Sequence, residues 1–258
     1  MISHKLLINY SYLTIDLLMK ENDITLYNYA TSPYGRKILA ALKYKGVKFD
    51  QVYVNPISTK EIKFTRQRII PILSIGEAWK VDSNQQAFWL DELFPQNPLF
   101  GEKTEDKKAI QDLVHWCDEF FIAAIFKMIT IKKNPHHYWW NGFKLGKRVQ
   151  ATSPNLPFFT PLFWAFVVNS APFVHREARK VKNHSQKEIN DKLSHFLFSK
   201  LEKMPNLYGD EISFADLAFF SQIELLKEFK FTYFDEALDN ELIRQWYLNI
   251  EKRIKHSS

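Results

Sequence analysis

The sequence predicts an α/β domain with one mixed sheet, followed by a region that is helical throughout. Three observations support this class. Strand and helix patterns alternate up to about residue 100, a polar, proline-containing segment "PQNPLFGEKTED" follows, and beyond it apolar residues recur at helical spacing. The chain has 258 residues, of which 46% are hydrophobic, so it is long enough to bury a substantial core.

The first half alternates between strands and helices. The run "ITLYNY" is typical of a strand, and "GRKILAALKYKG" of an amphipathic helix that ends at Gly46. The run "KFDQVYVN" predicts a second strand, and Ile75-Gly76 separates two further strands as a hairpin turn would. A last helix, "NQQAFWLDELF", ends before Pro95. The order βαβ followed by ββα is typical of one mixed sheet.

The second half is predicted to be helical. In "KKAIQDLVHWCDEFFIAAIFKMI" the apolar residues fall on one helical stripe that includes Cys117, so we interpret this cysteine as a core residue. Two later helices begin with capping boxes, in which Ser185 is followed by Glu188 and Ser213 by Asp216. We predict a first domain over 23–98, a linker over 99–107 and an all-helical domain over 108–258.

Two apolar stretches are too short to cross a membrane. Residues 1–22, "MISHKLLINYSYLTIDLLMKEN", are interrupted by Asp16 and have no small-residue cleavage site after them. Neither this run nor "LPFFTPLFWAFVV", over 156–168, reaches the ~20 apolar residues that a spanning helix requires. We interpret 1–22 as a leader or loosely attached extension and 156–168 as a buried or pocket-lining stretch, and we expect no membrane partner.

Charge and cysteine content limit the classes of function. The formal net charge is +6, but the 35 Lys and Arg residues are interleaved with 29 acidic ones, so we interpret them as a solvated surface and expect no nucleic-acid partner. The single cysteine excludes a disulfide framework and fits a reducing compartment, with the cytoplasm as the expected location. His136-His137 has no second pair at metal-ligand spacing, so we predict a surface aromatic loop there and no metal site.

The junction between the first strand and the first helix has the chemistry of an anion site. Ser32 is placed to cap the helix, and Pro33 is favoured at the first helical position. The unpaired N–H groups of a helix N-terminus carry a partial positive charge. Arg36 and Lys37 follow directly, and we expect them to add positive potential there. Taken alone, Ser32 is better explained as a plain helix cap.

Four segments together resemble the soluble glutathione transferases. They are "SPYGRK" at this junction, Pro71 in "RIIPIL", the acid-serine pair in "KVDSNQQAFWLDELFP", and "YGDEISFADLAFF" in the helical half. The resemblance covers roughly residues 23–250, and "SPYGRK" is most similar to serine-type members such as the tau class and the bacterial etherase-like enzymes. It implies a thioredoxin-like domain, an all-helical domain, glutathione bound as co-substrate across the first domain, and a homodimer.

The resemblance implies a catalytic role for Ser32. In serine-type members the hydroxyl donates a hydrogen bond to the glutathione thiolate, which is the anion at this helix N-terminus. Tyr27 and Tyr29 are alternatives, because other classes use a tyrosine near the end of this strand. Alternation along the strand places both tyrosines on one face, where either could instead be a core residue. Thr31 is a further neighbour of the site.

The resemblance also implies the residues that bind glutathione. Pro71 matches the cis-proline of the family, which frees the backbone of Ile70 to pair with the cysteinyl part. Ser83 and the helix N-terminus beside it bind the γ-glutamyl carboxylate, and Asp82 stands where Glu or Gln is usual. The lysine that often precedes the cis-proline is Ile69 here, so Arg68 is expected to take over the glycyl carboxylate; Lys63 is an alternative.

The second substrate is expected to be a small apolar electrophile held between the two halves. The junction supplies Tyr34, and the helical half supplies aromatic residues that do not follow a clean helical stripe. The predicted pocket residues there are Trp139, Trp140, Phe158, Phe159 and Trp164. The sequence therefore predicts a glutathione transferase; the alternative is a non-catalytic protein of the same fold that binds ligands or other proteins.

Overall fold

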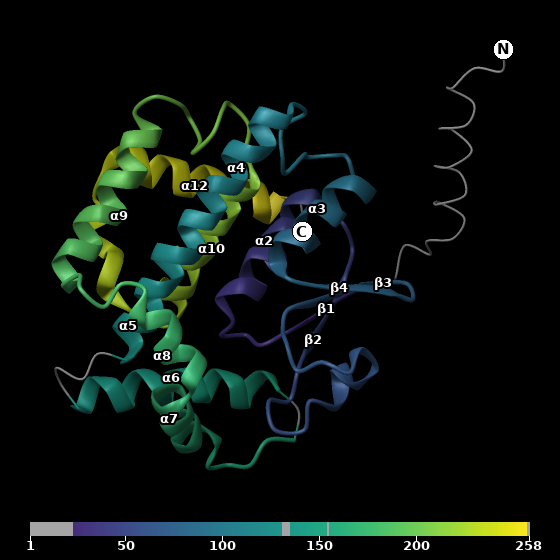
Figure 1. Ribbon diagram of the computed structural model, residues 1–258, viewed down its shortest axis with the longest axis vertical. Helices are drawn as coiled ribbons and strands as arrows, with labels where there is room; N and C mark the ends of the chain where they lie inside the picture. Colours follow the sequence, from purple (N-terminus) through teal and green to yellow (C-terminus); the bar gives the residue numbers. More distant parts are fainter. Residues whose placement is uncertain (1–22, 131–134, 154, 257–258) are drawn as a thin grey trace.

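The computed structural model describes residues 23–130, 135–153 and 155–256, so the expected leader over 1–22 lies outside the described residues. A small sheet region and a larger helical region lie side by side, and the helices α2 and α10 meet between them (Figure 1). One apolar core runs through both, from Leu26 on the first strand to Phe219 in the helical region. The predicted fold class, an α/β region followed by an all-helical one, is confirmed.

The sheet is mixed, as predicted. Its strand order is β2-β1-β3-β4; β1 and β2 are parallel, and the other neighbours are antiparallel. Gly76, with a φ of +57°, makes the turn between the last two strands, in the left-handed region that favours glycine. The strands are β1 (Ile24–Asn28), β2 (Asp50–Tyr53), β3 (Ile72–Ile75) and β4 (Ala78–Val81).

Two helices cover one face of the sheet, and a short helix covers the other. Ile24 and Leu26 point toward the core under α2 (Pro33–Lys45) and α3 (Ser83–Leu93). Tyr27 and Tyr29 point the other way, toward a small cluster that includes Ile62 of the 3-10 helix η1 (Lys60–Thr65). The two tyrosines therefore share one face, as the alternation predicts.

The helical region is built around α10 (Phe214–Glu228), of which twelve residues are buried. It packs against α2, α4 and the π-helical turn η2 (Cys117–Ile122). Cys117 is fully buried, which confirms its interpretation as a core residue. The remaining helices are α4 (Thr104–Trp116), α5 (Ala123–Thr130), α6 (Pro135–Thr152), α7 (Thr160–Ser170), α8 (Pro172–Arg179), α9 (Gln186–Leu201), the 3-10 helix η3 (Thr232–Phe234), α11 (Asp235–Leu238) and α12 (Glu241–His256).

Both predicted capping boxes are present. The Ser185 hydroxyl accepts a hydrogen bond from the Glu188 N–H at 3.2 Å, and the Glu188 carboxylate accepts one from the Ser185 N–H at 2.6 Å. At the start of α10 the Asp216 carboxylate accepts hydrogen bonds from the N–H and the hydroxyl of Ser213. The helix α4 begins at Thr104, inside the segment that we predicted as a linker.

One expectation about the segment from 135 to 170 is wrong. The sequence "HHYWW" is not a surface loop, because residues 135–152 form α6. The stretch 156–168, which we expected to be buried or to line a pocket, is largely helical, and several of its aromatic side chains are exposed, so it is not a buried stretch. α6 and α7 form a close helical pair: a Cβ at Gly142 would lie 2.6 Å from the Ala165 Cα, and one at Gly146 would lie 2.7 Å from the Pro161 Cα.

Candidate functional site

The sheet register brings the end of β1 beside the start of β3. Tyr27 is paired with Ile72, so the junction that follows β1 lies next to Ile70-Pro71, whose peptide bond is cis. Gln86, on α3, donates a hydrogen bond from Nε2 to the Pro71 carbonyl at 2.8 Å. Three predicted parts of the site, the Ser32 junction, Pro71 and the N-terminus of α3, are therefore neighbours although they are separated in the sequence.

Ser32 caps α2, as predicted. Its hydroxyl oxygen accepts a hydrogen bond from the Gly35 N–H at 3.1 Å, and its own N–H donates to the Tyr29 carbonyl at 2.9 Å. The side chain is buried. A serine hydroxyl has one proton to donate and can accept two hydrogen bonds. The cap uses one acceptor position, so the proton stays available for an anion in front of the helix.

Gly35 allows the first turn of α2 to sit closely on β1. A Cβ at this position would lie 1.9 Å from Oδ1 of Asn28, which is buried under the helix. No side chain fits in that space without a rearrangement. A side chain at this position would therefore have to displace the Asn28 amide or shift the helix.

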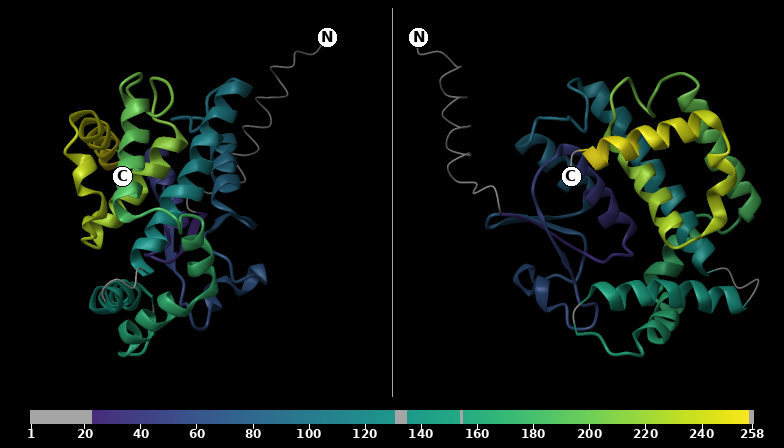
Figure 2. Two further views of the ribbon diagram at one scale, coloured as in Figure 1. Left: turned by 60° about the vertical axis from the view of Figure 1, so that its left-hand side comes forward. Right: turned by 180° about the vertical axis from the view of Figure 1, so that it is seen from behind.

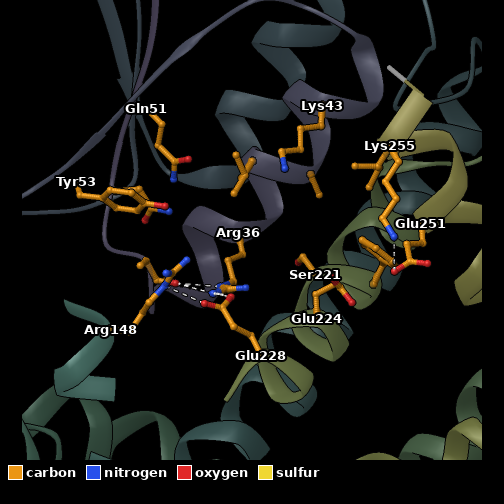
Figure 3. Close-up of a pocket in the computed structure, with 16 residues that line it drawn as sticks. Arg36, Lys43, Gln51, Tyr53, Arg148, Ser221, Glu224, Glu228, Glu251 and Lys255 are labelled. Carbon is orange, nitrogen blue, oxygen red and sulfur yellow. Dashed lines mark hydrogen bonds and ion pairs between the residues drawn. The ribbon is translucent and has the colours of Figure 1, made fainter. Parts of the chain in front are cut away.

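Arg36 does not supply free positive charge to the junction. Its guanidinium donates to the Ala30 carbonyl, from Nε at 3.0 Å and from NH2 at 2.8 Å, and it forms an ion pair with Glu228. Figure 3 shows Arg36 and Arg148 both directed at Glu228, on the wall of a cavity of about 340 Å³. Ser32, Pro71 and Ser83 are not among the residues that line this cavity.

Lys37 is likewise neutralised, by a pairing that the sequence did not reveal. Its side chain is fully buried, and Nζ donates to both carboxylate oxygens of Asp118 at 2.7 and 2.9 Å. It also donates to Oδ1 of Asn84, on the first turn of α3, at 3.2 Å. Our expectation that Arg36 and Lys37 raise the potential near the anion site is therefore wrong. Instead, Lys37 connects the N-termini of α2 and α3 to the helical region, through its bonds to Asn84 and Asp118.

At the second helix N-terminus the cap is Asp82. Its Oδ1 atom accepts hydrogen bonds from the N–H groups of Asn84 and Gln85, both at 3.0 Å, and its backbone has a φ of +68°. Asp82 is exposed, whereas Ser83, the first residue of the helix, is buried. Two of the free N–H groups of α3 are thus already occupied by a carboxylate, which leaves the N–H and hydroxyl of Ser83 for a ligand.

Two buried glutamines position the site, and sequence reasoning missed both. Gln86 donates to the carbonyls of Pro71 and Lys80, so it joins α3 to β3 and β4. Gln222, on α10, donates to the Pro33 carbonyl at 3.1 Å and so fixes the start of α2 from the helical side. The one signal in the sequence was an amide at a position where helical periodicity predicts a core residue.

The residues predicted beside Pro71 differ in exposure. Ile70 is half-buried and Pro71 is buried. Arg68 and Lys63, the candidates for the glycyl carboxylate, are both exposed on the segment that leads to β3. Arg68, Ile70 and Pro71 all lie on the segment that leads into β3.

Of the predicted pocket residues, Tyr34 belongs to the junction itself and Trp164 contacts Tyr29, which precedes it. The Trp164 ring contacts the Tyr29 ring edge-on, with 6.4 Å between the centroids. Tyr34 is partly buried and packs against the core, and burial, together with Glu177, Asp118 and Glu119, raises the pKa of its phenol. The other four, Trp139, Trp140, Phe158 and Phe159, are exposed on α6 and before α7.

The two alternative tyrosines are neutral at physiological pH. Burial raises the pKa of Tyr27, and burial together with the Glu61 charge raises that of Tyr29. Tyr27 packs on Phe64, with 5.3 Å between ring centroids, so both tyrosines contribute to the apolar face of the sheet. Burial also raises the pKa of the Cys117 thiol well above its usual value, which makes it a poor nucleophile.

Neither a metal cluster nor a membrane span is found in the part of the chain that the structure describes. No group of three or more His, Cys, Asp or Glu side chains in residues 23–130, 135–153 and 155–256 is arranged to hold a metal ion. Within the same ranges, every helix is too short or too polar to cross a bilayer.

Comparisons with known proteins agree with this architecture. Residues 26–98 match the family of the glutathione S-transferase N-terminal domain. Prostaglandin E synthase 2 from Danio rerio is 22% identical, over 91% of this chain and 72% of that protein. A glutathione S-transferase from Sinorhizobium meliloti 1021 has a similar structure, with a TM-score of 0.61, 17% identity and 91% of each chain covered.

A second solved structure was determined with glutathione bound. This glutathione S-transferase from Methylobacillus flagellatus KT has a TM-score of 0.58 and 18% identity, over 91% of this chain and 98% of that one. The chain therefore has the fold of the glutathione transferases, and its first domain matches the family of their N-terminal domain.

Proposed function

We propose that this protein is a serine-type glutathione transferase, in which Ser32 stabilises the glutathione thiolate for attack on an apolar electrophile. The observation that carries the proposal is the Ser32 hydroxyl, which caps α2 beside the cis-proline Pro71 and keeps its proton free. A neutral cap of this kind leaves the positive end of the helix without a countercharge.

The required stabilisation is within the range of this geometry. A free thiol has a pKa of about 8.5, and lowering it by ~2 units requires about 2.7 kcal/mol of preferential binding of the thiolate. One hydrogen bond to a charged group contributes roughly 1.5–3 kcal/mol, and a helix N-terminus about 0.3–1 kcal/mol more. Because Arg36 and Lys37 are both paired with carboxylates, Ser32 and the helix have to supply this energy between them.

The remainder of glutathione is proposed to lie along the surface at the start of β3 and the start of α3. The backbone of Ile70 would pair with the cysteinyl part, next to Pro71. The hydroxyl and N–H of Ser83 would bind the γ-glutamyl carboxylate. Asp82 uses Oδ1 for its cap, so its other oxygen, Oδ2, is the atom proposed to accept from the γ-glutamyl amino group. Arg68 is proposed for the glycyl carboxylate.

The electrophile is proposed to lie between Tyr34 and the helical region. Trp164 supplies an apolar ring close to the strand that carries the junction. The wall would be extended outward by Trp139, Trp140, Phe158 and Phe159. The proposed form of the enzyme is a homodimer in the cytoplasm. An apolar wall next to the thiolate favours substrates in which the reacting carbon belongs to a largely apolar molecule.

Replacement of Ser32 by alanine tests the proposal. Ser32→Ala should lower turnover with a generic electrophile by about 10- to 100-fold, or roughly 1.4–2.7 kcal/mol, and raise the pKa of the bound thiol. The ultraviolet absorbance of the thiolate, titrated against pH, measures that pKa. Tyr27→Phe and Tyr29→Phe are the matched controls. If either control removes the thiolate while Ser32→Ala retains it, that tyrosine is the thiolate partner.

A second candidate function is the one named for the relative. Prostaglandin E synthase 2 from Danio rerio and from Mus musculus align with 91% of this chain, which favours formation of prostaglandin E as a candidate reaction. Formation of prostaglandin E from its precursor, measured side by side with thiol conjugation, separates the two. Retention on immobilised glutathione without either reaction would indicate the non-catalytic alternative.

A further inference from the structure

The helix α7 is apolar on both its inner and its outer side. Its inner side, with Pro161 and Ala165, is pressed against the glycines of α6. Its outer side carries Leu162, Phe163 and Phe166, which are 63%, 45% and 58% exposed. A helix that is apolar all round is ordinarily covered all round. The described residues cover only the inner side of this helix.

Further aromatic side chains extend this outer face beyond the helix. Phe158 is 89% exposed, and Phe159, Phe173 and Trp140 are also exposed. We call the resulting surface the aromatic face; α6 and α7 carry most of it at one end of the molecule (Figures 1 and 2). Single exposed apolar residues are common on proteins, but several large ones on neighbouring elements, as here, indicate an interaction surface. The aromatic face consists of Trp140, Phe158, Phe159, Leu162, Phe163, Phe166 and Phe173.

The sequence that carries the aromatic face is rich in cations. Between positions 120 and 176 the sequence contains seven Lys and Arg residues and no Asp or Glu, although the whole chain has a net charge of only +6. The run from 149 to 174 has no charged residue at all. Exposed cations stand on both sides of it, Lys147 and Arg148 before it and Arg176 and Arg179 after it. Arg148 and Arg176 are paired with Glu228 and Glu177, whereas Lys147 and Arg179 stand beside the apolar surface as exposed cations. An apolar surface with cations at its margin suits an anionic, apolar-cored partner.

We propose that the aromatic face binds the surface of a membrane that contains anionic lipids, with α7 lying in the plane of the interface. Its Phe and Leu side chains would enter the boundary between headgroups and acyl chains, and the rim cations would meet the lipid phosphates. From the length of the apolar stretches alone, which is too short for a spanning helix, we expect no membrane partner. A helix that lies on the surface is not subject to that length requirement.

A second copy of this chain is a poorer occupant. In a two-fold dimer through the aromatic face, each basic rim would meet the same rim of the partner, since the two surfaces are identical. The exposed rings of α7 also stand on the outer side of a helix, which is a convex surface. A fluid lipid surface can adapt to that shape, whereas a protein partner needs a matching hollow.

Vesicle flotation tests the proposal with the full chain. The wild type should float with vesicles of mixed phosphatidylcholine and phosphatidylserine, and float less at high salt and with phosphatidylcholine alone, because the rim charges are screened or unpaired there. The variant Phe163→Ser/Phe166→Ser should reduce vesicle affinity by about tenfold or more. Its matched control is Phe198→Ser/Leu248→Ser, which removes exposed apolar side chains from α9 and α12.

A second pair of variants tests the charged rim separately. Lys147→Gln/Arg179→Gln should reduce affinity for the anionic vesicles by roughly tenfold, whereas Lys203→Gln/Lys252→Gln, elsewhere on the surface, should leave it within about twofold. All four positions are exposed, so the fold should persist in each variant. Absence of flotation in the wild type would overturn the proposal. Losses of vesicle affinity in the control variants as large as those in the test variants would overturn it too. So would a dimer that forms through the aromatic face and does not bind vesicles.

Discussion

The N-termini of α2 and α3 lie close together but are capped by different chemistry. The α2 cap is the neutral hydroxyl of Ser32, whereas the α3 cap is the carboxylate of Asp82, which occupies two N–H groups. A hydroxyl satisfies a backbone donor without cancelling the helix dipole, whereas a carboxylate cancels much of it. The comparison indicates that α2 is the stronger site for a thiolate and that α3 depends on Ser83 to hold a second anion.

The largest expected effect comes from the residue that connects the two N-termini. Lys37→Met would leave the Asp118 carboxylate without its cationic partner, so we expect a loss of about 3–5 kcal/mol in the free energy of unfolding, measured by urea denaturation. The double variant Lys37→Met/Asp118→Leu should recover most of that loss because it leaves no buried unpaired charge. A single variant as stable as the wild type would contradict this structural role.

Giving α2 the cap of α3 tests the comparison directly. Ser32→Asp should still cap the helix, because a carboxylate accepts from N–H groups as well as a hydroxyl does. Repulsion between this carboxylate and the thiolate should lower turnover by at least about 100-fold, or roughly 2.7 kcal/mol, with the thermal midpoint retained. Turnover equal to that of Ser32→Ala would show that charge at this N-terminus is unimportant.

At α3, removal of a hydroxyl should affect binding more than stability. Because Asp82 carries the cap, Ser83→Ala should weaken glutathione affinity by roughly 1–3 kcal/mol and change the free energy of unfolding by less than ~0.5 kcal/mol. Asp82→Ala is the opposite control, with an expected stability loss of about 0.5–2 kcal/mol. Calorimetric titration with glutathione and urea denaturation measure the two quantities. The roles would be reversed if Ser83→Ala were the less stable variant.

The smallest expected effect is a change in the free energy of unfolding at alkaline pH. Burial and the nearby Glu177, Asp118 and Glu119 raise the pKa of Tyr34 in the folded state. Below about pH 10 the phenol is protonated in both states; above it the unfolded chain loses the proton first, so Tyr34 lowers stability as pH rises. Tyr34→Phe should therefore gain on the order of 1 kcal/mol relative to the wild type between about pH 9 and pH 11. A pH-independent difference would contradict this assignment.

Local features of the structure were readable from the sequence. The strands, the helix starts at Ser32, Ser185 and Ser213, and the hairpin at Gly76 depend on residues within about four positions of one another. Capping, turn formation and alternation are local interactions, so the chain specifies them wherever they occur. The same holds for Cys117, whose burial follows from helical spacing alone.

Tertiary structure alone decided which groups became partners. Asp118 is 81 residues from Lys37, and Gln222 is 189 residues from Pro33. Seen in sequence, Arg36 and Lys37 are two cations beside an anion site; in the structure both are neutralised by carboxylates from the helical region. Whether a charge or a buried amide is paired depends on the residues that pack against it, and those residues are distant in the chain. For the same reason, periodicity did not show which side of α7 would be left exposed.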